Sequence, residues 1–210
     1  MIEFKNISLK QQNKKILKDF NLYIKNGERV VIFGASGSGK TTILRLIAGF
    51  ITPDSGEIFI DNKRVTKDGK IIIQPHKRDI GMVFQDLALW THMSVEENIE
   101  FGLKIQKIPK KQRKEKVVKF LCLVGLNDYG SKRVNQLSGG EQQRVALARS
   151  LVLSPKILLM DEPLSSLDEA LNIVLRKEIV KLQLELGFTL VYVTHNMDEA
   201  KEIKERIIYL

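Results

Sequence analysis

Eight residues in the N-terminal quarter of the chain have the types and spacing of a phosphate-binding loop. Residues 34–41 fit the pattern G-x-x-x-x-G-K-[ST] between a predicted strand and a predicted helix. Glycines let backbone N–H groups turn inward around phosphate oxygens, and a helix start adds the positive end of its dipole. Lys40 can neutralise the β- and γ-phosphates, and the Thr41 hydroxyl can ligate Mg²⁺. The residues expected to bind the nucleotide phosphates here are Gly34, Ala35, Ser36, Gly37, Ser38, Gly39, Lys40, Thr41 and Thr42.

Two adjacent carboxylates follow a second short apolar run, at residues 157–160. A buried strand that ends in an acid places a carboxylate beside a metal, so Asp161 is expected to hold Mg²⁺, through water. Glu162 follows at the strand end, where it can face the γ-phosphate and orient the attacking water. The alternative is solvent-facing charge, which the phosphate loop elsewhere in the chain disfavours. A phosphate loop alone serves kinases, GTPases and many ATPases.

The elements that must hold these residues alternate between strand and helix patterns. Residues 2–9 and 16–24 alternate apolar and polar side chains, as half-buried strands do, with a polar loop predicted at 10–15. Residues 29–33 and 80–84 are apolar runs typical of buried strands. Residues 56–60 and 71–73 indicate further strands. Apolar spacing after the phosphate loop predicts a helix that ends at Gly49.

Helical patterns then replace strands over residues 87–153, at 95–103, 111–124 and 140–153. The strand and helix alternation returns with strands at 157–160, 189–194 and 207–210, and helices at 169–186 and 197–204. These patterns predict one α/β domain over residues 1–210. We expect a P-loop NTPase core with a mixed β-sheet, an N-terminal antiparallel β-subdomain (together 1–86 and 154–210), and an inserted α-helical subdomain at 87–153.

Composition restricts the class of protein. Of 210 residues 43% are hydrophobic, which suits a folded domain, and no apolar run reaches the ~20 residues of a membrane span. The first residues lack the apolar core of a signal peptide, so a cytoplasmic location is expected. The lone Cys122 excludes an intramolecular disulfide and is predicted to be a buried helix residue.

The formal net charge is +9, and its densest cluster lies at residues 110–119. A solvated helix face is the main interpretation, with contact to anionic lipid headgroups as the alternative. No aromatic residues are interleaved with these lysines as stacking platforms, so no nucleic-acid partner is expected.

Residues 137–144, which read Leu-Ser-Gly-Gly-Glu-Gln-Gln-Arg, resemble the signature of ATP-binding-cassette (ABC) ATPases, and nearly the whole chain is similar to their nucleotide-binding subunit. The resemblance implies a head-to-tail homodimer or heterodimer with two ATP molecules between the subunits. In such a dimer, Ser138, Gly139 and Gly140 of one subunit, at a helix start, close on the ATP held by the other, with Glu141 beside them.

Other family positions carry over one at a time. Gln85 matches the glutamine that reaches Mg²⁺ and links the core to the helical insert. Asp168 matches the aspartate that signals across the dimer, and His195 matches the histidine that contacts the γ-phosphate. The resemblance therefore implies Lys40, Gln85, Glu162 and His195 as catalytic residues, and Thr41, Gln85 and Asp161 as metal ligands.

The chain departs from the family pattern at the adenine position. These ATPases usually carry an aromatic residue in the loop after the first strand, but no aromatic lies between Lys5 and Lys18. Adenine is then held weakly, by another group, or by Gln11, which aligns near that position. Asn196 stands where an aspartate is common, without removing a catalytic group.

Residues 78–85, 89–99 and 161–168 are similar to importers of the spermidine, ferric-iron, sugar and molybdate type. This implies an ATPase on the cytoplasmic face of the membrane. Its expected partners are a second ATP-binding subunit, integral membrane subunits and a substrate-binding protein. Trp90 and Phe101 would line the groove for a helix of the membrane subunit, or else form the core of the insert.

Two other functions stay open: a soluble ABC ATPase acting on a metal-cluster scaffold, and a non-catalytic nucleotide sensor. The sensor would need the loss of Glu162 or His195, and both are present. The resemblance stops at Leu210, where many importer subunits continue into a regulatory β-domain. The expectation is therefore a minimal or a truncated subunit. The transported substrate stays open, as does import against export.

Overall fold

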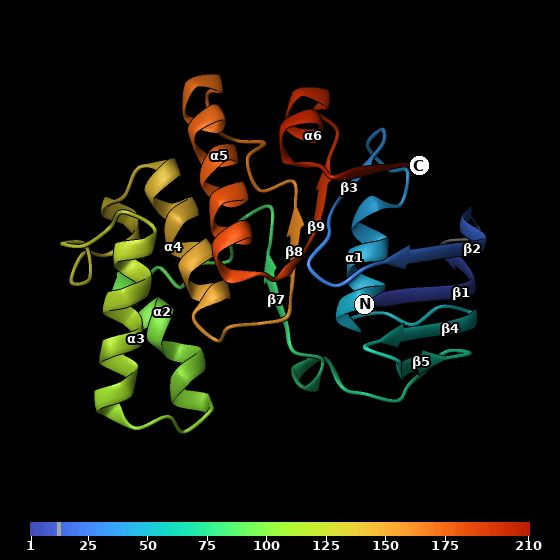
Figure 1. Cartoon of the computed structure of the whole chain (residues 1–210), viewed down its shortest axis with the longest axis horizontal. Helices are drawn as coiled ribbons and strands as arrows, with labels where there is room; N and C mark the ends of the chain where they lie inside the picture. The colour runs from blue at the N-terminus through green and yellow to red at the C-terminus, as the bar shows by residue number, and fades with distance from the viewer. Residues whose placement is uncertain (12–13) are drawn as a thin grey trace.

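The computed structural model describes residues 1–11 and 14–210, which form two sheets flanked by helices (Figure 1). The first sheet is antiparallel, in the order β2-β1-β4-β5-β6. Burial in β1 alternates on either side of an irregularity at Asn6: Ile2 and Phe4 are buried before it, and Ile7 and Leu9 after it. The strands of this sheet are β1 (Ile2–Gln11), β2 (Lys14–Ile24), β4 (Ser55–Ile60), β5 (Lys63–Lys67) and β6 (Lys70–Ile71).

The predicted polar loop at 10–15 was wrong for most of its length, because β1 runs to Gln11 and β2 begins at Lys14, directly opposite in register. The hairpin ends carry polar side chains on both faces, so apolar alternation could not reveal them. Residues 12 and 13 lie outside the described residues.

The second sheet is parallel throughout its described pairings, in the order β10-β3-β9-β8-β7. The predicted α/β class is confirmed. The two strand directions are divided between the sheets, since the first sheet is antiparallel and the second is parallel. The expectation that residues 80–84 form a buried strand was wrong in burial, because β7 is an edge strand and only Val83 is buried. The strands are β3 (Arg29–Phe33), β7 (Ile80–Val83), β8 (Ile157–Asp161), β9 (Thr189–Thr194) and β10 (Arg206–Tyr209).

Helix α1 (Lys40–Ala48) packs against both sheets. Its buried Ile43, Leu44 and Ile47 share one hydrophobic cluster with β1 residues and with β3 and β9 residues. Full burial of each such side chain stabilises the fold by roughly 1.5–3 kcal/mol. The phosphate loop therefore begins a helix that is fixed on two sides. Helices α5 (Glu169–Leu186) and α6 (Met197–Ile203) share the other hydrophobic cluster with β8 and β9.

The helical insert contains α2 (Val95–Ile105), α3 (Lys110–Leu123) and α4 (Gly139–Leu151), with a short 3₁₀ turn at Val134–Gln136. Another 3₁₀ turn, Pro75–Lys77, precedes β7 in the core. Its core is continuous with that of β8 and β9. The prediction for Cys122 was wrong: α3 buries Val117, Phe120 and Leu121, and Cys122 lies off this stripe, exposed. Among the described residues, no helix is long and apolar enough to cross a membrane.

Arg78, which the sequence did not single out, is buried and 3% exposed. Its guanidinium donates at 3.1 and 2.8 Å to the carbonyls of Leu46 and Ile47, at the end of α1 where a cation is favoured. Its other acceptors are the carbonyls of Ile73 and Val65 and the hydroxyl of Thr66. Burial lowers the pKa of Arg78 to about 10, so the group stays charged at neutral pH. A Cβ at Gly49 would lie 2.4 Å from its Cζ, which explains why a glycine ends α1.

We expect Arg78→Gln to lower the free energy of unfolding by about 2–4 kcal/mol, because several buried carbonyls would lose their donors. Urea denaturation at pH 7 measures the change. The control is Lys77→Gln on the exposed neighbour, which should stay within about 0.5 kcal/mol of the wild type. Equal stability of the two variants would contradict the structural role of Arg78.

Candidate active site

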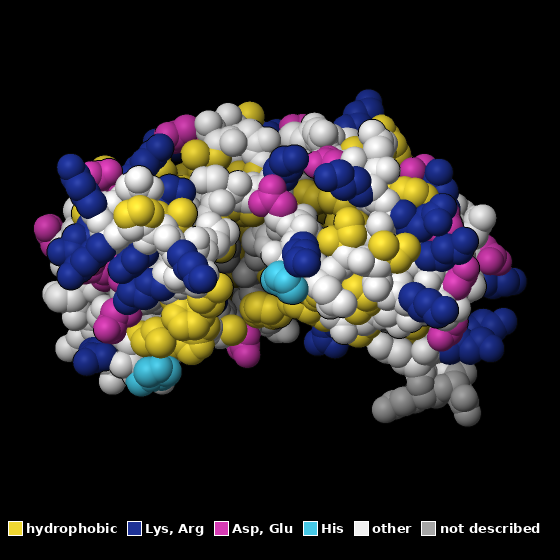
Figure 2. All heavy atoms as spheres, turned by 90° about the horizontal axis from the view of Figure 1, so that it is seen from below, with side chains coloured by type: hydrophobic (Ala, Val, Ile, Leu, Met, Phe, Trp, Pro, Cys, Tyr) yellow, Lys and Arg dark blue, Asp and Glu magenta, His cyan; other side chains and the backbone are white. Residues whose placement is uncertain are grey.

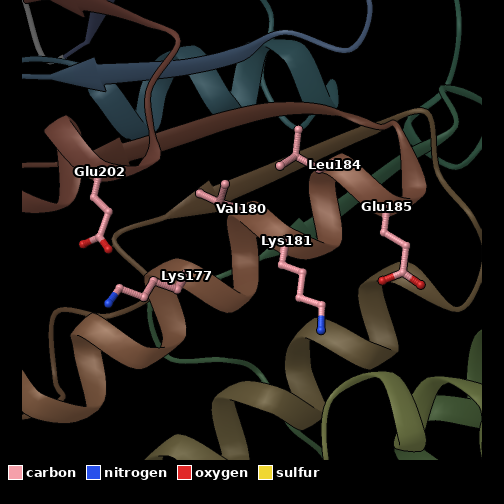
Figure 3. Close-up of a pocket in the computed structure, with 6 residues that line it drawn as sticks. All are labelled: Lys177, Val180, Lys181, Leu184, Glu185 and Glu202. Carbon is pink, nitrogen blue, oxygen red and sulfur yellow. The ribbon is translucent and has the colours of Figure 1, made fainter.

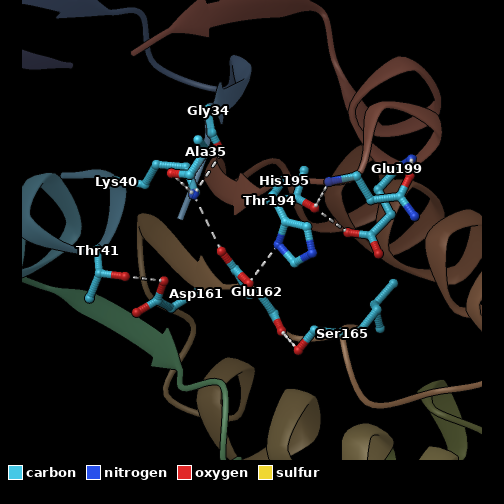
Figure 4. Close-up of polar contacts among 12 residues, drawn as sticks. Gly34, Ala35, Lys40, Thr41, Asp161, Glu162, Ser165, Thr194, His195 and Glu199 are labelled. Atoms are coloured by element: carbon cyan, nitrogen blue, oxygen red, sulfur yellow. Dashed lines mark hydrogen bonds and ion pairs between the residues drawn. The ribbon is translucent and has the colours of Figure 1, made fainter. Parts of the chain in front are cut away.

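The phosphate loop lies between β3 and α1, at the carboxyl edge of the parallel sheet (Figure 4). Gly37 and Gly39 have φ of 79° and 101°, which a residue with a Cβ rarely adopts. The Lys40 ammonium lies inside this turn and donates to the carbonyls of Gly34 and Ala35 at 2.8 and 3.0 Å. The buried Ser38 hydroxyl has no partner among the described residues, which fits a loop that binds an oxygen-rich ligand.

Thr41 and Asp161 meet beside the loop. The Thr41 hydroxyl donates to Asp161 Oδ1 at 2.8 Å. Burial raises the pKa of Asp161, an effect that the Thr41 hydrogen bond opposes and the neighbouring Glu162 charge adds to. A hydroxyl and a carboxylate are the oxygen ligands that Mg²⁺ takes when phosphates and waters complete its shell. The described residues include no cluster of three acidic, histidine or cysteine side chains that could hold a metal alone.

Glu162 connects Lys40 to His195. One of its oxygens lies 3.4 Å from Lys40 Nζ, and the other lies 2.9 Å from His195 Nδ1. The Glu162 backbone has φ of 44°, and its N–H donates to the Val193 carbonyl on β9. A non-glycine residue in this region costs about 1 kcal/mol or more and is typical of functional sites. The structure therefore brings together the phosphate loop, both carboxylates and His195.

Gln85 and Gln11 make no side-chain hydrogen bond within the described part of the chain. Gln85 follows β7 and is exposed. Gln11 is exposed at the end of β1. Their roles, at the metal and at adenine, stay predictions.

The signature residues have a structural role within the chain. Ser138 caps α4: its hydroxyl accepts from the Glu141 N–H, and the Glu141 carboxylate accepts from the Ser138 N–H at 2.7 Å. A Cβ at Gly140 would lie 2.5 Å from the Leu171 side chain, so this glycine lets α4 approach α5. Asp168 caps α5 through the Leu171 N–H. No hydrogen bond of the described residues joins the signature to the phosphate loop of the same chain.

Arg149 was not predicted as a site residue. It donates at 2.7 and 2.6 Å to the carbonyls of Leu87 and Ala88, two consecutive residues with positive φ. Its guanidinium also lies 5.0 Å from the Trp90 ring centroid. The loop after Gln85 is thus hydrogen-bonded to α4, the helix that Ser138 caps. The sequence signal for Arg149 was only that of a basic residue in the last turn of a helix.

An apolar surface groove of about 720 Å³ is lined by residues of both the insert and the core. Hydrophobic side chains lie on both sides of this hollow in the view from below (Figure 2). Trp90 and Phe101, 4.4 Å apart between ring centroids, form part of one wall, and Phe50 and Phe84 stack at 6.3 Å on the other side. The structure thus places Trp90 and Phe101 in a groove, as the resemblance implies.

A second hollow lies along the outer face of α5, away from these residues (Figure 3). It contains none of the predicted site residues. Its lining consists of Lys177, Val180, Lys181, Leu184, Glu185 and Glu202. Lys181 and Glu185 of this lining are exposed and lie outside the predicted site.

A phosphate loop on a helix start, facing two strand-end carboxylates across a parallel sheet, defines a nucleotide-binding domain of the P-loop class. Residues 17–165 match the family model described as ABC transporter. The chain therefore belongs to the ABC transporter family of ATP-binding cassettes, which confirms the resemblance drawn from the signature and the phosphate loop.

Among curated relatives, the spermidine/putrescine import ATP-binding protein PotA of Clostridium acetobutylicum is 45% identical over 210 residues, covering 100% of this chain and 58% of that protein. The Fe(3+) ions import ATP-binding protein FbpC of Fusobacterium nucleatum is 44% identical over 206 residues, and the match covers 98% of this chain and 54% of that protein. The chain thus spans between half and three-fifths of the length of these relatives.

Solved structures show the same fold. A dimeric post-hydrolysis state of the ATP-binding cassette MJ0796 bound to ADP and Pi is 37% identical, with a TM-score of 0.86, covering 100% of this chain and 94% of that one. The structure of cbiO1 from Clostridium perfringens, part of the ABC transporter complex cbiONQ, is 32% identical, with a TM-score of 0.90, covering 99% and 83%.

We expect Asp161→Asn to raise thermal stability near pH 8. The wild-type carboxylate is charged and desolvated there, whereas the Asn amide oxygen can still accept from Thr41. The folded pKa lies above the ordinary 3.8, so the unfavourable contribution of the carboxylate is complete above the folded pKa and vanishes as pH falls toward 3.8. The stability gain should shrink in that direction. Melting curves from pH 8 to pH 4 measure it, and a gain that grows on acidification would contradict the assignment.

Proposed function

We propose that this chain binds ATP with Mg²⁺ and hydrolyses it as the ATP-binding subunit of a membrane importer. The observation that carries the proposal is the convergence of Lys40, Glu162 and His195 beside the phosphate loop. Membership of the ABC transporter family and the import proteins among its relatives support it.

The residues present can hydrolyse ATP by positioning and electrostatics. Lys40 and the loop amides hold the triphosphate. Glu162 orients a water molecule and takes its proton as the water oxygen attacks the γ-phosphorus. The bond from that phosphorus to the bridging oxygen breaks, and ADP retains the electron pair. His195 Nδ1 lies 2.9 Å from Glu162 Oε2, within hydrogen-bond distance, so the imidazole orients the carboxylate. The same ring contacts the γ-phosphate.

Thr41 and Asp161 are the groups that would hold Mg²⁺, Asp161 through water, with Gln85 as a further ligand. When bound, the ion neutralises charge on the β- and γ-phosphate oxygens. For adenine, Gln11 is the group we propose to lie along the ring.

We also propose that two copies of the chain enclose two ATP molecules. Within one chain the signature lies apart from the phosphate loop, yet its Ser138 and Gly139 begin α4, where an anion is favoured. A second copy can present this helix start to the γ-phosphate, with Asp168 at the contact. The dimeric MJ0796 cassette with ADP and Pi supports this arrangement.

The groove between the insert and the core is the proposed site for a helix of an integral membrane subunit at the cytoplasmic face of the membrane. It is apolar and lies beside the loop that Arg149 ties to α4. A partner bound there could therefore affect the signature helix. A substrate-binding protein would deliver the solute to the membrane subunits.

Replacing Glu162 tests the hydrolytic step. We expect Glu162→Gln to bind ATP with near-normal affinity, to lose about 10²–10³-fold in kcat, and to accumulate as an ATP-bound dimer, because the water lacks its base. Phosphate release and size-exclusion chromatography with ATP measure these effects. Glu185→Gln, on the exposed face of α5, is the matched control. Near-normal turnover of Glu162→Gln would refute its role.

A second test addresses the groove. Ile105 is 67% exposed and lines it, so Ile105→Asp should weaken binding to the membrane subunits by about tenfold or more, since an unpaired carboxylate would be buried. Basal ATPase activity of the isolated chain should persist. Val118→Asp is the control, because Val118 on α3 is 66% exposed and outside the groove. Equal binding of both variants, measured in detergent by co-purification, would exclude the groove as the docking site.

A further inference from the structure

Glu199 on α6 is a buried carboxylate, 3% exposed, to which the mechanism above gives no part. Its Oε2 accepts from the Tyr192 hydroxyl at 2.9 Å and from the Thr194 hydroxyl at 2.8 Å, and its Oε1 accepts from the Asn172 amide at 3.0 Å. A buried carboxylate carries a desolvation cost of several kcal/mol, and an apolar residue would fill the same space without it. The carboxylate therefore requires an explanation other than packing.

Ion pairing does not supply that explanation. The buried Arg176 pairs with Glu169 and Glu202. The hydrogen-bond donors to Glu199 within the described chain are all uncharged. These donors share a location. Tyr192 and Thr194 lie on β9, which leads to His195, and Asn172 contacts the loop that follows Glu162.

The first segment carries His195. The Thr194 hydroxyl that donates to Glu199 also accepts from the Asn196 N–H at 3.0 Å, so one hydroxyl joins both neighbours of His195 (Figure 4). Asn196 in turn caps α6 through the N–H groups of Asp198 and Glu199. The His195 side chain itself is 52% exposed, so its direction depends on this backbone and on its bond to Glu162.

The second segment carries Glu162. The Asn172 amide that donates to Glu199 also donates to the carbonyl of Leu164 at 3.3 Å, two residues beyond Glu162. Glu162 has a positive φ, so its backbone conformation must be maintained by its surroundings. One carboxylate thus contacts both loops, through Thr194 on one side and Asn172 on the other.

We propose that Glu199 is a positioning residue that holds the loops of Glu162 and His195 in register, so that the two side chains meet over the γ-phosphate. The proposal rests on the roles assigned to that pair under the proposed function. Both oxygens of the buried Glu199 carboxylate have donors, and hydrogen bonds of fixed direction specify one arrangement, whereas an apolar core residue would tolerate several.

The first test is Glu199→Gln. The amide has the same size, but its N–H₂ group can only donate. Facing Tyr192 and Thr194, it reverses both hydroxyl hydrogen bonds, and facing Asn172, it meets another N–H₂ group, so the wild-type contacts are not reproduced in either orientation. We expect kcat to fall by about 10- to 100-fold, as small misplacements of catalytic groups do. The Kd for ATP should change by less than about threefold, because the phosphate loop is untouched.

A readout independent of turnover is the His195 ring. The chain has three histidines, so histidine-labelled protein gives few ring resonances, and His195→Ala assigns the relevant one. Glu199→Gln should shift the His195 resonance and leave those of His76 and His92 in place. Asp198→Asn, on the exposed neighbour, is the matched control and should alter neither kcat nor the resonance.

Variants of Thr194 provide a second test, which applies even if Glu199→Gln fails to fold. Thr194→Val removes the hydroxyl at nearly constant volume and should lower kcat and shift the resonance in the same way. Thr194→Ser keeps the hydroxyl and should restore both. A role limited to stability would lower the melting temperature of Thr194→Val without changing kcat per folded molecule.

The proposal is overturned if Glu199→Gln or Thr194→Val, folded, retains kcat within twofold of the wild type and an unshifted His195 resonance. If the wild type itself hydrolyses no ATP, the proposed function fails. The resonance then still decides whether Glu199 positions His195.

Discussion

The parallel alignment of β3, β9 and β8 is the constraint on which the site depends. Their hydrogen-bonded register sets Phe33 beside Thr194 and Asp161 beside Val193. The residues that follow these strands, Gly34, His195 and Glu162, therefore emerge at one edge of the sheet. Parallel strands share this edge because all their carboxyl ends point the same way, and ligands of open α/β sheets bind there. A slip of one residue in either pairing would turn Glu162 away from Lys40.

The position of these residues at one sheet edge does not by itself stabilise the site, because bringing their side chains together is unfavourable in free energy. Asp161 is desolvated, Glu162 has a positive φ, and Lys40 is 4% exposed. The packing around them supplies the compensation. Helix α1 is buried against both sheets, and Arg78 binds the carbonyls at its far end. The helix that begins at the phosphate loop is therefore held in two ways. Its apolar face packs between the sheets, and the buried Arg78 cation binds its C-terminal carbonyls.

Much of this arrangement could be predicted from the sequence, because strong local patterns coincide with the chemistry. The ranges of β3, β9 and α5 match the predictions, and the loop, both carboxylates and His195 converge as expected. Errors arose where tertiary context decides. Strand β5 (Lys63–Lys67) was missed because its composition is mostly charged and its strand character comes from pairing with β4. The same limit applied to Cys122 and β7, whose burial depends on what packs against them.

Glu199 and Arg149 show a different limit. Each is a charged residue within a helical pattern, so the sequence predicts a solvated side chain. In the structure each contacts a segment from another part of the chain: Arg149 donates to Leu87 and Ala88, and Glu199 accepts from Asn172 on α5, which donates in turn to Leu164 in the loop of Glu162. Spacing cannot indicate such contacts, since they join segments that meet only after the sheet has formed. The residues that perform the chemistry can thus be recognised by motif, whereas those that hold them in place are defined by burial and by hydrogen bonds between loops.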